Sequence, residues 1–101
     1  ELQFKELPKF PVVRRDLALL LERETSFDQI RKIAFETERK ILRQVSLFDV
    51  YEGDRIEAGK KSYAVSFLLG DDTKTLTDTE TDKVMERLVK AFSGKLGASI
   101  R

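Results

Sequence analysis

Residues 42–69 read Leu-Arg-Gln-Val-Ser-Leu-Phe-Asp-Val-Tyr-Glu-Gly-Asp-Arg-Ile-Glu-Ala-Gly-Lys-Lys-Ser-Tyr-Ala-Val-Ser-Phe-Leu-Leu. Both ends of this stretch are rich in β-branched and aromatic residues with a period of two, which is typical of strands. Between them, residues 52–60 contain Gly53 and Gly59 and predict a loop. The sequence therefore predicts two consecutive strands, at residues 42–51 and 61–69.

A helix is predicted on each side of this strand pair, because each side carries a capping box. Ser26-Phe27-Asp28-Gln29 begins a helix that we expect to extend to about residue 40. Thr77-Asp78-Thr79-Glu80 begins a second helix, which Gly94 and Gly97 are expected to end. In both helices, apolar residues recur at the spacing of a single buried stripe.

Two more strands complete the pattern. Residues 14–21 are dense in leucine and suit a central strand, and residues 98–101 are short enough for an edge strand. The resulting order, β-α-β-β-α-β, is that of the ferredoxin-like split βαβ sandwich. We therefore expect an α+β fold in which two helices cover one face of a four-stranded antiparallel sheet. Residues 1–11 are expected to form an irregular lead-in, and residues 12–101 the domain.

The amino-acid composition excludes several kinds of catalytic and metal-binding site. The 101 residues are 41% hydrophobic and 37% charged, with a net charge of +1 and neither cysteine nor histidine. Disulfides, thiolate catalysis, imidazole relays and cysteine- or histidine-bound metals are therefore excluded. No apolar run approaches the roughly 18 residues of a membrane span, so no membrane partner is expected, and the cytoplasm is the default location. Because the chain begins with Glu1 and its only methionine is Met85, we expect a piece of a longer protein.

The alternation of side chains predicts which residues lie on the uncovered face of the sheet. With Tyr51 paired opposite Ser62, one face is apolar and is the expected core face: Phe48, Val50, Tyr63, Val65, Phe67 and Leu69. The opposite face is mixed: Val45, Leu47, Asp49, Tyr51, Ser62, Ala64, Ser66 and Leu68. On the first strand, the outward residues would be Arg14, Asp16, Ala18 and Leu20.

Such a mixed open face suits unstacked bases of single-stranded nucleic acid. An aromatic ring stacks on a base for roughly 1–3 kcal/mol, and Asp or Ser side chains hydrogen-bond base edges. Five basic residues are candidates for phosphate contacts: Arg14, Arg15, Arg43, Lys60 and Lys61. The plainer interpretation is that Asp49 and Ser62 are solvated strand-end residues and that Tyr51 fills space. For Arg14 and Arg15, an ion pair with Asp16 or Asp49 is the corresponding structural alternative.

Four blocks of the sequence resemble a known family. They are Phe10-Pro11-x-x-Arg14-Arg15-Asp16-Leu17-Ala18-Leu19, Leu47-Phe48-Asp49-Val50-Tyr51, Gly59-Lys60-Lys61-Ser62 and Thr75-Leu76-Thr77-Asp78-x-Glu80. In this order and spacing they resemble the ferredoxin-fold anticodon-binding domain, which is the C-terminal domain of the β subunit of bacterial phenylalanyl-tRNA synthetase. The resemblance covers residues 4–101.

The resemblance implies a non-catalytic module that binds the anticodon stem-loop of tRNA(Phe). The family's contacts to the first anticodon base correspond here to Asp49, Tyr51 and Ser62, with Arg14, Arg15 and Lys61 as further RNA-binding candidates. By analogy, Tyr51 would stack on the base, Asp49 would accept from a guanine edge, and Ser62 would hydrogen-bond the base or backbone. The parent ligase would use ATP and magnesium elsewhere, and its α subunit and the rest of the β subunit would be partners in a heterotetramer. A related domain ends the single-chain organellar enzyme, so the resemblance leaves both parents open.

A metal site and a protein-interaction module are the two alternatives to an RNA-binding face. The sequence contains an acidic cluster that matches no calcium loop and is better explained by a turn and a helix N-terminus, so no metal is expected: Asp71, Asp72, Asp78, Glu80 and Asp82.

A ferredoxin-like domain of this kind can also be a regulatory or protein-interaction module. That alternative differs in salt dependence, because phosphate contacts weaken steeply with salt and an apolar interface does not.

Overall fold

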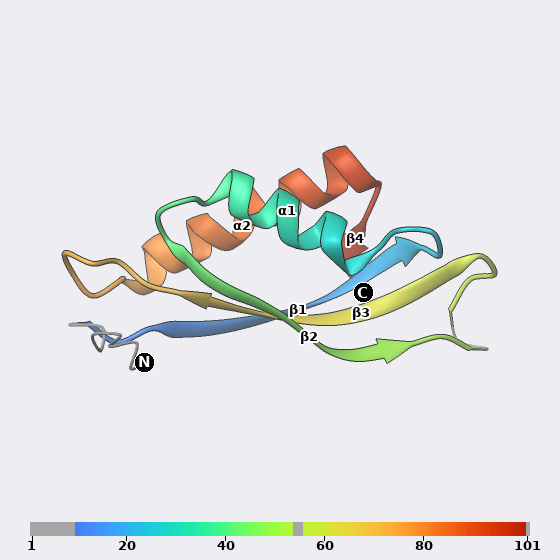
Figure 1. Ribbon diagram of the computed structural model, residues 1–101, viewed down its shortest axis with the longest axis horizontal. Helices are drawn as coiled ribbons and strands as arrows, with labels where there is room; N and C mark the ends of the chain where they lie inside the picture. The colour runs from blue at the N-terminus through green and yellow to red at the C-terminus, as the bar shows by residue number, and fades with distance from the viewer. Residues whose placement is uncertain (1–9, 54–55, 101) are drawn as a thin grey trace, which may run out of the picture.

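The computed structural model describes residues 10–53 and 56–100 and has two layers, a sheet with both helices over one face (Figure 1). The strands are β1 (Val13–Glu22), β2 (Leu42–Tyr51), β3 (Lys60–Leu69) and β4 (Ser99–Ile100), and the helices are α1 (Phe27–Thr37) and α2 (Asp78–Leu96). The strand order is β2-β3-β1-β4, and every neighbouring pair is antiparallel. The predicted α+β ferredoxin-like sandwich is confirmed. Most of the predicted lead-in, residues 1–9, lies outside the described residues.

Both helices begin at the predicted capping boxes. The Ser26 hydroxyl accepts a hydrogen bond from the backbone N–H of Gln29 (3.2 Å), and the Gln29 side chain accepts one from the backbone N–H of Ser26 (2.8 Å). Thr77 and Glu80 make the same reciprocal pair at the start of α2. Each box satisfies backbone donors that have no partner inside the helix.

The ends of the helices differ from the prediction. Helix α1 ends at Thr37 rather than near residue 40, because Glu38 leaves the helical conformation and its buried carboxylate ion-pairs with Arg87 of α2. Helix α2 continues through Gly94 to Leu96, and only Gly97 ends it. Gly97 adopts a left-handed conformation (φ 65°), which glycine reaches without a steric penalty.

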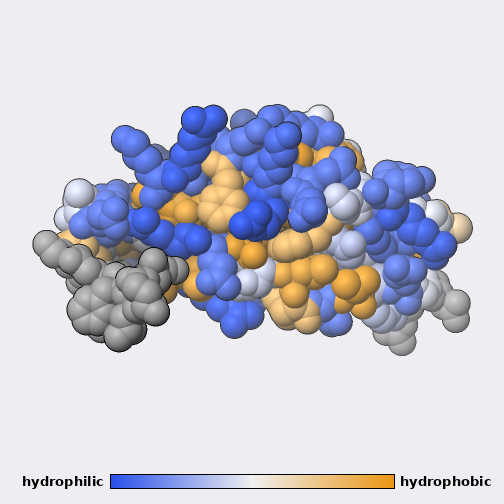
Figure 2. All heavy atoms as spheres, viewed as in Figure 1, coloured by the Kyte–Doolittle hydropathy of each residue, from blue (hydrophilic) through white to orange (hydrophobic). Residues whose placement is uncertain are grey.

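The core lies between the helices and the sheet. Phe67 of β3 and Phe92 of α2 are fully buried, with their ring centroids 6.1 Å apart. Leu19 and Leu21 of β1 are also buried, and so is Val65 of β3, as predicted. Seen from the side in Figure 2, hydrophobic residues gather in the middle of the molecule, with hydrophilic residues over the helices and toward both ends. The helices thus cover most of one face of the sheet.

Strand β2 contains a bulge that the sequence-based face assignment missed. Tyr51 pairs with Ser62 and Asp49 with Ala64, but Leu47 pairs with Val65, so Phe48 is an extra residue in β2. An extra residue reverses the alternation of side chains beyond it. A second irregularity lies between Leu42 and Gln44.

The bulge corrects three predicted positions. Val45 and Leu47 were expected on the open face, but Val45 is buried in the core and Leu47 packs against the core. Phe48 was expected in the core, yet its side chain is 52% exposed. Val50 does share the helix-side face with its partner Tyr63, but it is 47% exposed and contributes little to the core.

Removing the bulge should destabilise the fold much more than removing the Phe48 ring. Deletion of Phe48 forces β2 into regular alternation, so either Val45 and Leu47 leave the core or Asp49 and Tyr51 enter it. We expect a loss of about 3 kcal/mol, since burying one such apolar side chain contributes about 1.5–3 kcal/mol. Phe48→Ala, which keeps the bulge, should cost less than about 1 kcal/mol. Urea unfolding of both variants measures this, and equal stabilities would contradict the assignment.

Candidate nucleic-acid interface

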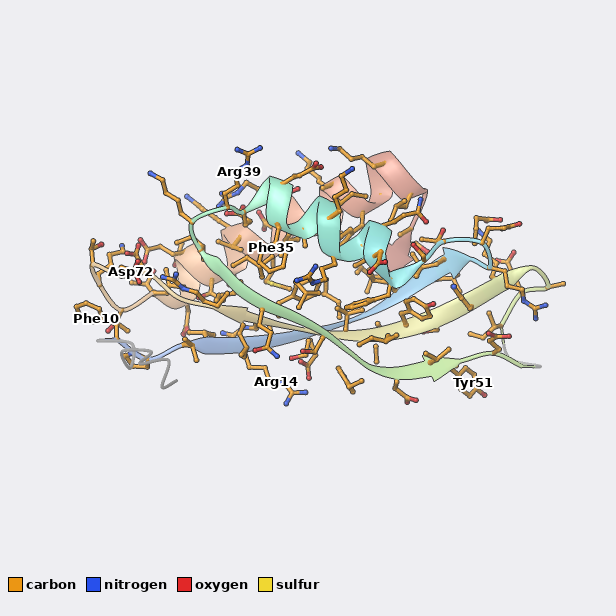
Figure 3. The ribbon with its side chains drawn as sticks, viewed as in Figure 1. Phe10, Arg14, Phe35, Arg39, Tyr51 and Asp72 are labelled. Atoms are coloured by element: carbon orange, nitrogen blue, oxygen red, sulfur yellow. The ribbon has the colours of Figure 1, made fainter. Side chains whose placement is uncertain are left out.

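The face of the sheet opposite the helices collects most of the predicted site. Side chains of directly paired residues share a face, and Ser62 and Ala64 of β3 alternate with the buried Val65 and Phe67. Their β2 partners, Tyr51 and Asp49, therefore lie on the open face, as predicted. Figure 3 shows Tyr51 and Arg14 pointing away from the helices.

Exposure differs sharply among the predicted base-contacting residues. Tyr51 is 38% exposed and Asp49 is exposed, so both are accessible from solvent. Ser62 is only 3% exposed and lies between its two cross-strand neighbours, Tyr51 and Leu20. Ser62 therefore lies in the floor of the site, and its hydroxyl reaches a ligand only if a neighbouring side chain shifts.

Arg14 forms an ion pair with Asp16. Its guanidinium Nε donates to Asp16 Oδ1 at 2.9 Å, and Nη2 donates to Oδ2 at 3.3 Å. Arg14 also lies over the ring of Phe48, with its guanidinium carbon 5.4 Å from the ring centroid. The structural alternative for Arg14 is thus realised, while the residue remains on the open face.

Arg15 and Lys61 do not lie on the open face. Arg15 reaches toward the start of α2, where its Nη2 is 3.9 Å from an Asp78 carboxylate oxygen. Lys61 is buried on the helix side and its ammonium donates to the Tyr63 hydroxyl at 2.8 Å. The two residues are therefore separated from Asp49 and Tyr51 by the thickness of the sheet.

The other two basic candidates, Lys60 and Arg43, form ion pairs with carboxylates. Lys60 pairs with Glu22 across β3 and β1 at 2.8 Å, and this hydrogen bond raises the pKa of Lys60 above its ordinary value. Arg43 pairs with Asp72 at 2.7 Å. With Arg14 and Arg15 also paired, the positive charges around the site are locally neutralised.

Phe48 is the site-face residue that the sequence analysis missed. A signal for it exists in β2, where Val45 and Leu47 are apolar while Asp49 and Tyr51, which have the same parity, are polar. A regular strand would place all four on one face. The change from apolar to polar along one parity indicates a bulge between residues 47 and 49, which places Phe48 beside Arg14.

Comparison with known proteins places the chain in a family. A family model described as the ferredoxin-fold anticodon binding domain matches residues 8–101. The chain belongs to this anticodon-binding domain family. Phenylalanine–tRNA ligase beta subunits of Bacteroides fragilis, Porphyromonas gingivalis and Clostridium tetani are 59%, 50% and 45% identical to it over all 101 residues. The chain spans 12–13% of the length of these relatives.

In this anticodon-binding domain, three acidic residues after β3 and in the first turn of α2 have structural partners: Asp71, Asp72 and Glu80. Asp71 Oδ1 accepts from the Thr73 hydroxyl (2.7 Å) and backbone N–H (2.8 Å), and these bonds lower the pKa of Asp71. Asp72 pairs with Arg43, and Glu80 completes the capping box of α2. Turn and cap geometry therefore accounts for these carboxylates. Among the described helices, none is long and apolar enough to cross a membrane.

Glu80 should contribute to the acid sensitivity of the domain. Hydrogen bonds from the Lys74 ammonium and then from the Thr77 backbone lower the pKa of Glu80 below its ordinary value of 4.5. A carboxyl group with a lowered folded-state pKa stabilises the fold above its unfolded pKa, and this contribution disappears as pH falls through the folded pKa. Glu80→Gln keeps a cap acceptor but does not titrate.

The Glu80→Gln variant should therefore lose less stability than the wild type between about pH 5 and pH 3. Urea unfolding at several pH values measures the difference, and the other carboxyl groups, present in both proteins, cancel. If the free energies of unfolding of the two proteins decrease in parallel as the pH falls, the assignment of this contribution to Glu80 is wrong.

Proposed function

We propose that this chain is the anticodon-binding module of a phenylalanine–tRNA ligase β subunit, and that its open sheet face binds the anticodon stem-loop of tRNA(Phe). The observation that carries the proposal is the placement of Asp49, Tyr51 and Ser62 together on the uncovered face of a domain from this family. The names of the relatives support the choice of parent.

The chemistry of the face fits a single-stranded loop. Tyr51 offers a partly exposed ring on which an unstacked base rests, and Asp49 offers a carboxylate that accepts hydrogen bonds from the N–H groups of a guanine edge. Ser62, in the floor of the site, hydrogen-bonds the base once a neighbouring side chain shifts. Arg14 supplies a cation on the same face, although Asp16 offsets much of its charge. Arg23 lies nearer to Tyr51 in the fold, because it pairs at 3.6 Å with Glu52, the next residue in the chain.

Arg15 and Lys61 have different roles in this proposal. Their side chains lie on the helix side of the sheet, so they contribute to the packing and charge balance of the domain rather than to direct contact with RNA on the open face. Their removal should therefore change stability before it changes the discrimination between anticodons.

The role of the chain in its parent is positioning rather than chemistry. The parent reaction is the ATP-dependent charging of tRNA(Phe) with phenylalanine in the cytoplasm, with ATP and magnesium bound outside this domain. The partners are the rest of the β subunit and the α subunit of the heterotetramer. Holding the anticodon fixes the orientation of the tRNA and raises the effective concentration of its acceptor end.

Titration of the isotopically labelled chain with an anticodon stem-loop of tRNA(Phe) tests the proposal. Backbone NMR shifts should cluster on Asp49, Tyr51 and Ser62, and binding should be tighter than to a stem-loop with a changed anticodon. Affinity for both RNAs should fall with salt, whereas their ratio should persist, because stacking and base-edge hydrogen bonds are screened little. Equal, diffuse shifts with both RNAs would overturn anticodon recognition. If the chain binds neither RNA but binds a protein partner with an affinity that does not depend on salt, it is an interaction module.

Tyr51→Ala should weaken binding to the cognate stem-loop by about 1–3 kcal/mol, the usual contribution of one stacked base. Because Tyr51 lies outside the core, the variant should stay folded. Val50→Ala is the matched control, since Val50 is its neighbour in β2, is similarly exposed and faces the helix side. Equal affinities of the two variants would contradict the role of Tyr51.

A further inference from the structure

Phe48 is a large apolar side chain that the fold leaves on the open face. It is 52% exposed, the most exposed large hydrophobic side chain among the described residues. It follows from the bulge that Phe48 is not part of the core, so its ring adds little to the stability of the fold. Aromatic rings exposed on a sheet face, as Phe48 and Tyr51 are here, are the side chains on which bases of single-stranded nucleic acid stack.

The surroundings of Phe48 hold its ring in place. The Arg14 guanidinium lies 5.4 Å from the ring centroid, and Asp16 fixes that guanidinium through two hydrogen bonds. Arg14 comes from β1 and Phe48 from β2, so the contact crosses the open face above β3. A preorganised ring loses little conformational freedom when a flat ligand stacks on it.

The spacing to Tyr51 suits a second nucleotide of the same strand. Phe48 and Tyr51 are three residues apart in β2, which corresponds to roughly 10 Å along a strand. A single-stranded loop with splayed bases follows such a row of rings, one base on each. The cation next to Phe48 complements the negative charge of the RNA backbone.

From these contacts we infer that Phe48, braced by Arg14, is a second base-stacking position on the open face, for a loop nucleotide other than the one stacked on Tyr51. This inference rests on the proposed function, because the occupant is a base of the same single-stranded loop. It assigns Phe48 to ligand contact and Arg14 to positioning the ring.

A set of stem-loops tests the inference, each carrying a single abasic site at a different position of the loop. Each RNA is titrated against the wild-type chain, Phe48→Ala, Tyr51→Ala and the control Val50→Ala. Phe48→Ala should weaken binding of the intact loop about tenfold, while Val50→Ala leaves it unchanged. The melting temperature of Phe48→Ala confirms that this variant is folded.

The pattern of abasic effects identifies the stacked base. For one loop position, the abasic RNA should bind wild type and Phe48→Ala equally, because the stacking partner is already missing. For Tyr51→Ala, that position should be a different one. Arg14→Gln should weaken the same interaction as Phe48→Ala, but less.

The outcomes separate this inference from the proposed function. If the wild-type chain fails to bind the intact stem-loop at all concentrations reached, the proposed function is wrong and the inference falls with it. If Tyr51→Ala weakens binding and Phe48→Ala does not, only the inference is wrong. Equal weakening by Phe48→Ala for every abasic RNA, or a Phe48-dependent dimer with unchanged RNA binding, would also overturn it.

Discussion

The extra residue in β2 is the constraint on which both faces of the sheet depend. Side chains alternate along a strand with a period of two, so Val45, Leu47, Asp49 and Tyr51 would share one face in a regular strand. The fold needs the first two in the core and the last two in solvent. The bulge at Phe48 satisfies both requirements, because it reverses the alternation between Leu47 and Asp49. One irregular backbone position thus allows a single strand to serve the core at one end and the open face at the other.

The helices determine which face remains available. Phe92 and Leu88 of α2 and Ile30 of α1 are fully buried, so the helices cover the part of the sheet that bears Val65 and Phe67. On the other face, β3 carries small side chains that project little from the sheet: Ser62, Ala64 and Ser66. The larger residues of β2 and β1 stand beside it. The aromatic rings and carboxylates of the open face therefore stand around a shallow surface.

Local signals in the sequence were enough to predict the elements, and long-range contacts explain where prediction failed. The capping boxes at Ser26 and Thr77 depend only on residues three apart, and both helices begin there. The end of α1 depends on Glu38 meeting Arg87, 49 residues further along the chain, and no local pattern contains that contact.

In the candidate site, too, the part next to the β2–β3 connection was predictable from the sequence and the part beyond the bulge was not. Tyr51 and Ser62 are paired next to the β2–β3 connection, so the assumed register holds there for Asp49 as well. Beyond Phe48 the register shifts by one, and the assumption of strict alternation assigns Val45 and Leu47 to the wrong face. Sequence reasoning thus placed Asp49, Tyr51 and Ser62 on the open face, but it missed Phe48 and gave no sign that Ser62 is covered.

The charge distribution decides what kind of binding energy this face can supply. The chain has a net charge of +1, and most basic residues near the sheet are paired with carboxylates: Arg14 with Asp16, Arg15 with Asp78, Arg23 with Glu52, Arg43 with Asp72, and Lys60 with Glu22. Such a surface attracts RNA weakly from a distance. Under the proposed function, the affinity of this face for RNA comes from short-range stacking and hydrogen bonds, which depend on the identity and geometry of each base. A weak but selective contact of this kind fits the proposed function, in which other parts of the parent subunit raise the local concentration of the RNA and this face discriminates between loops.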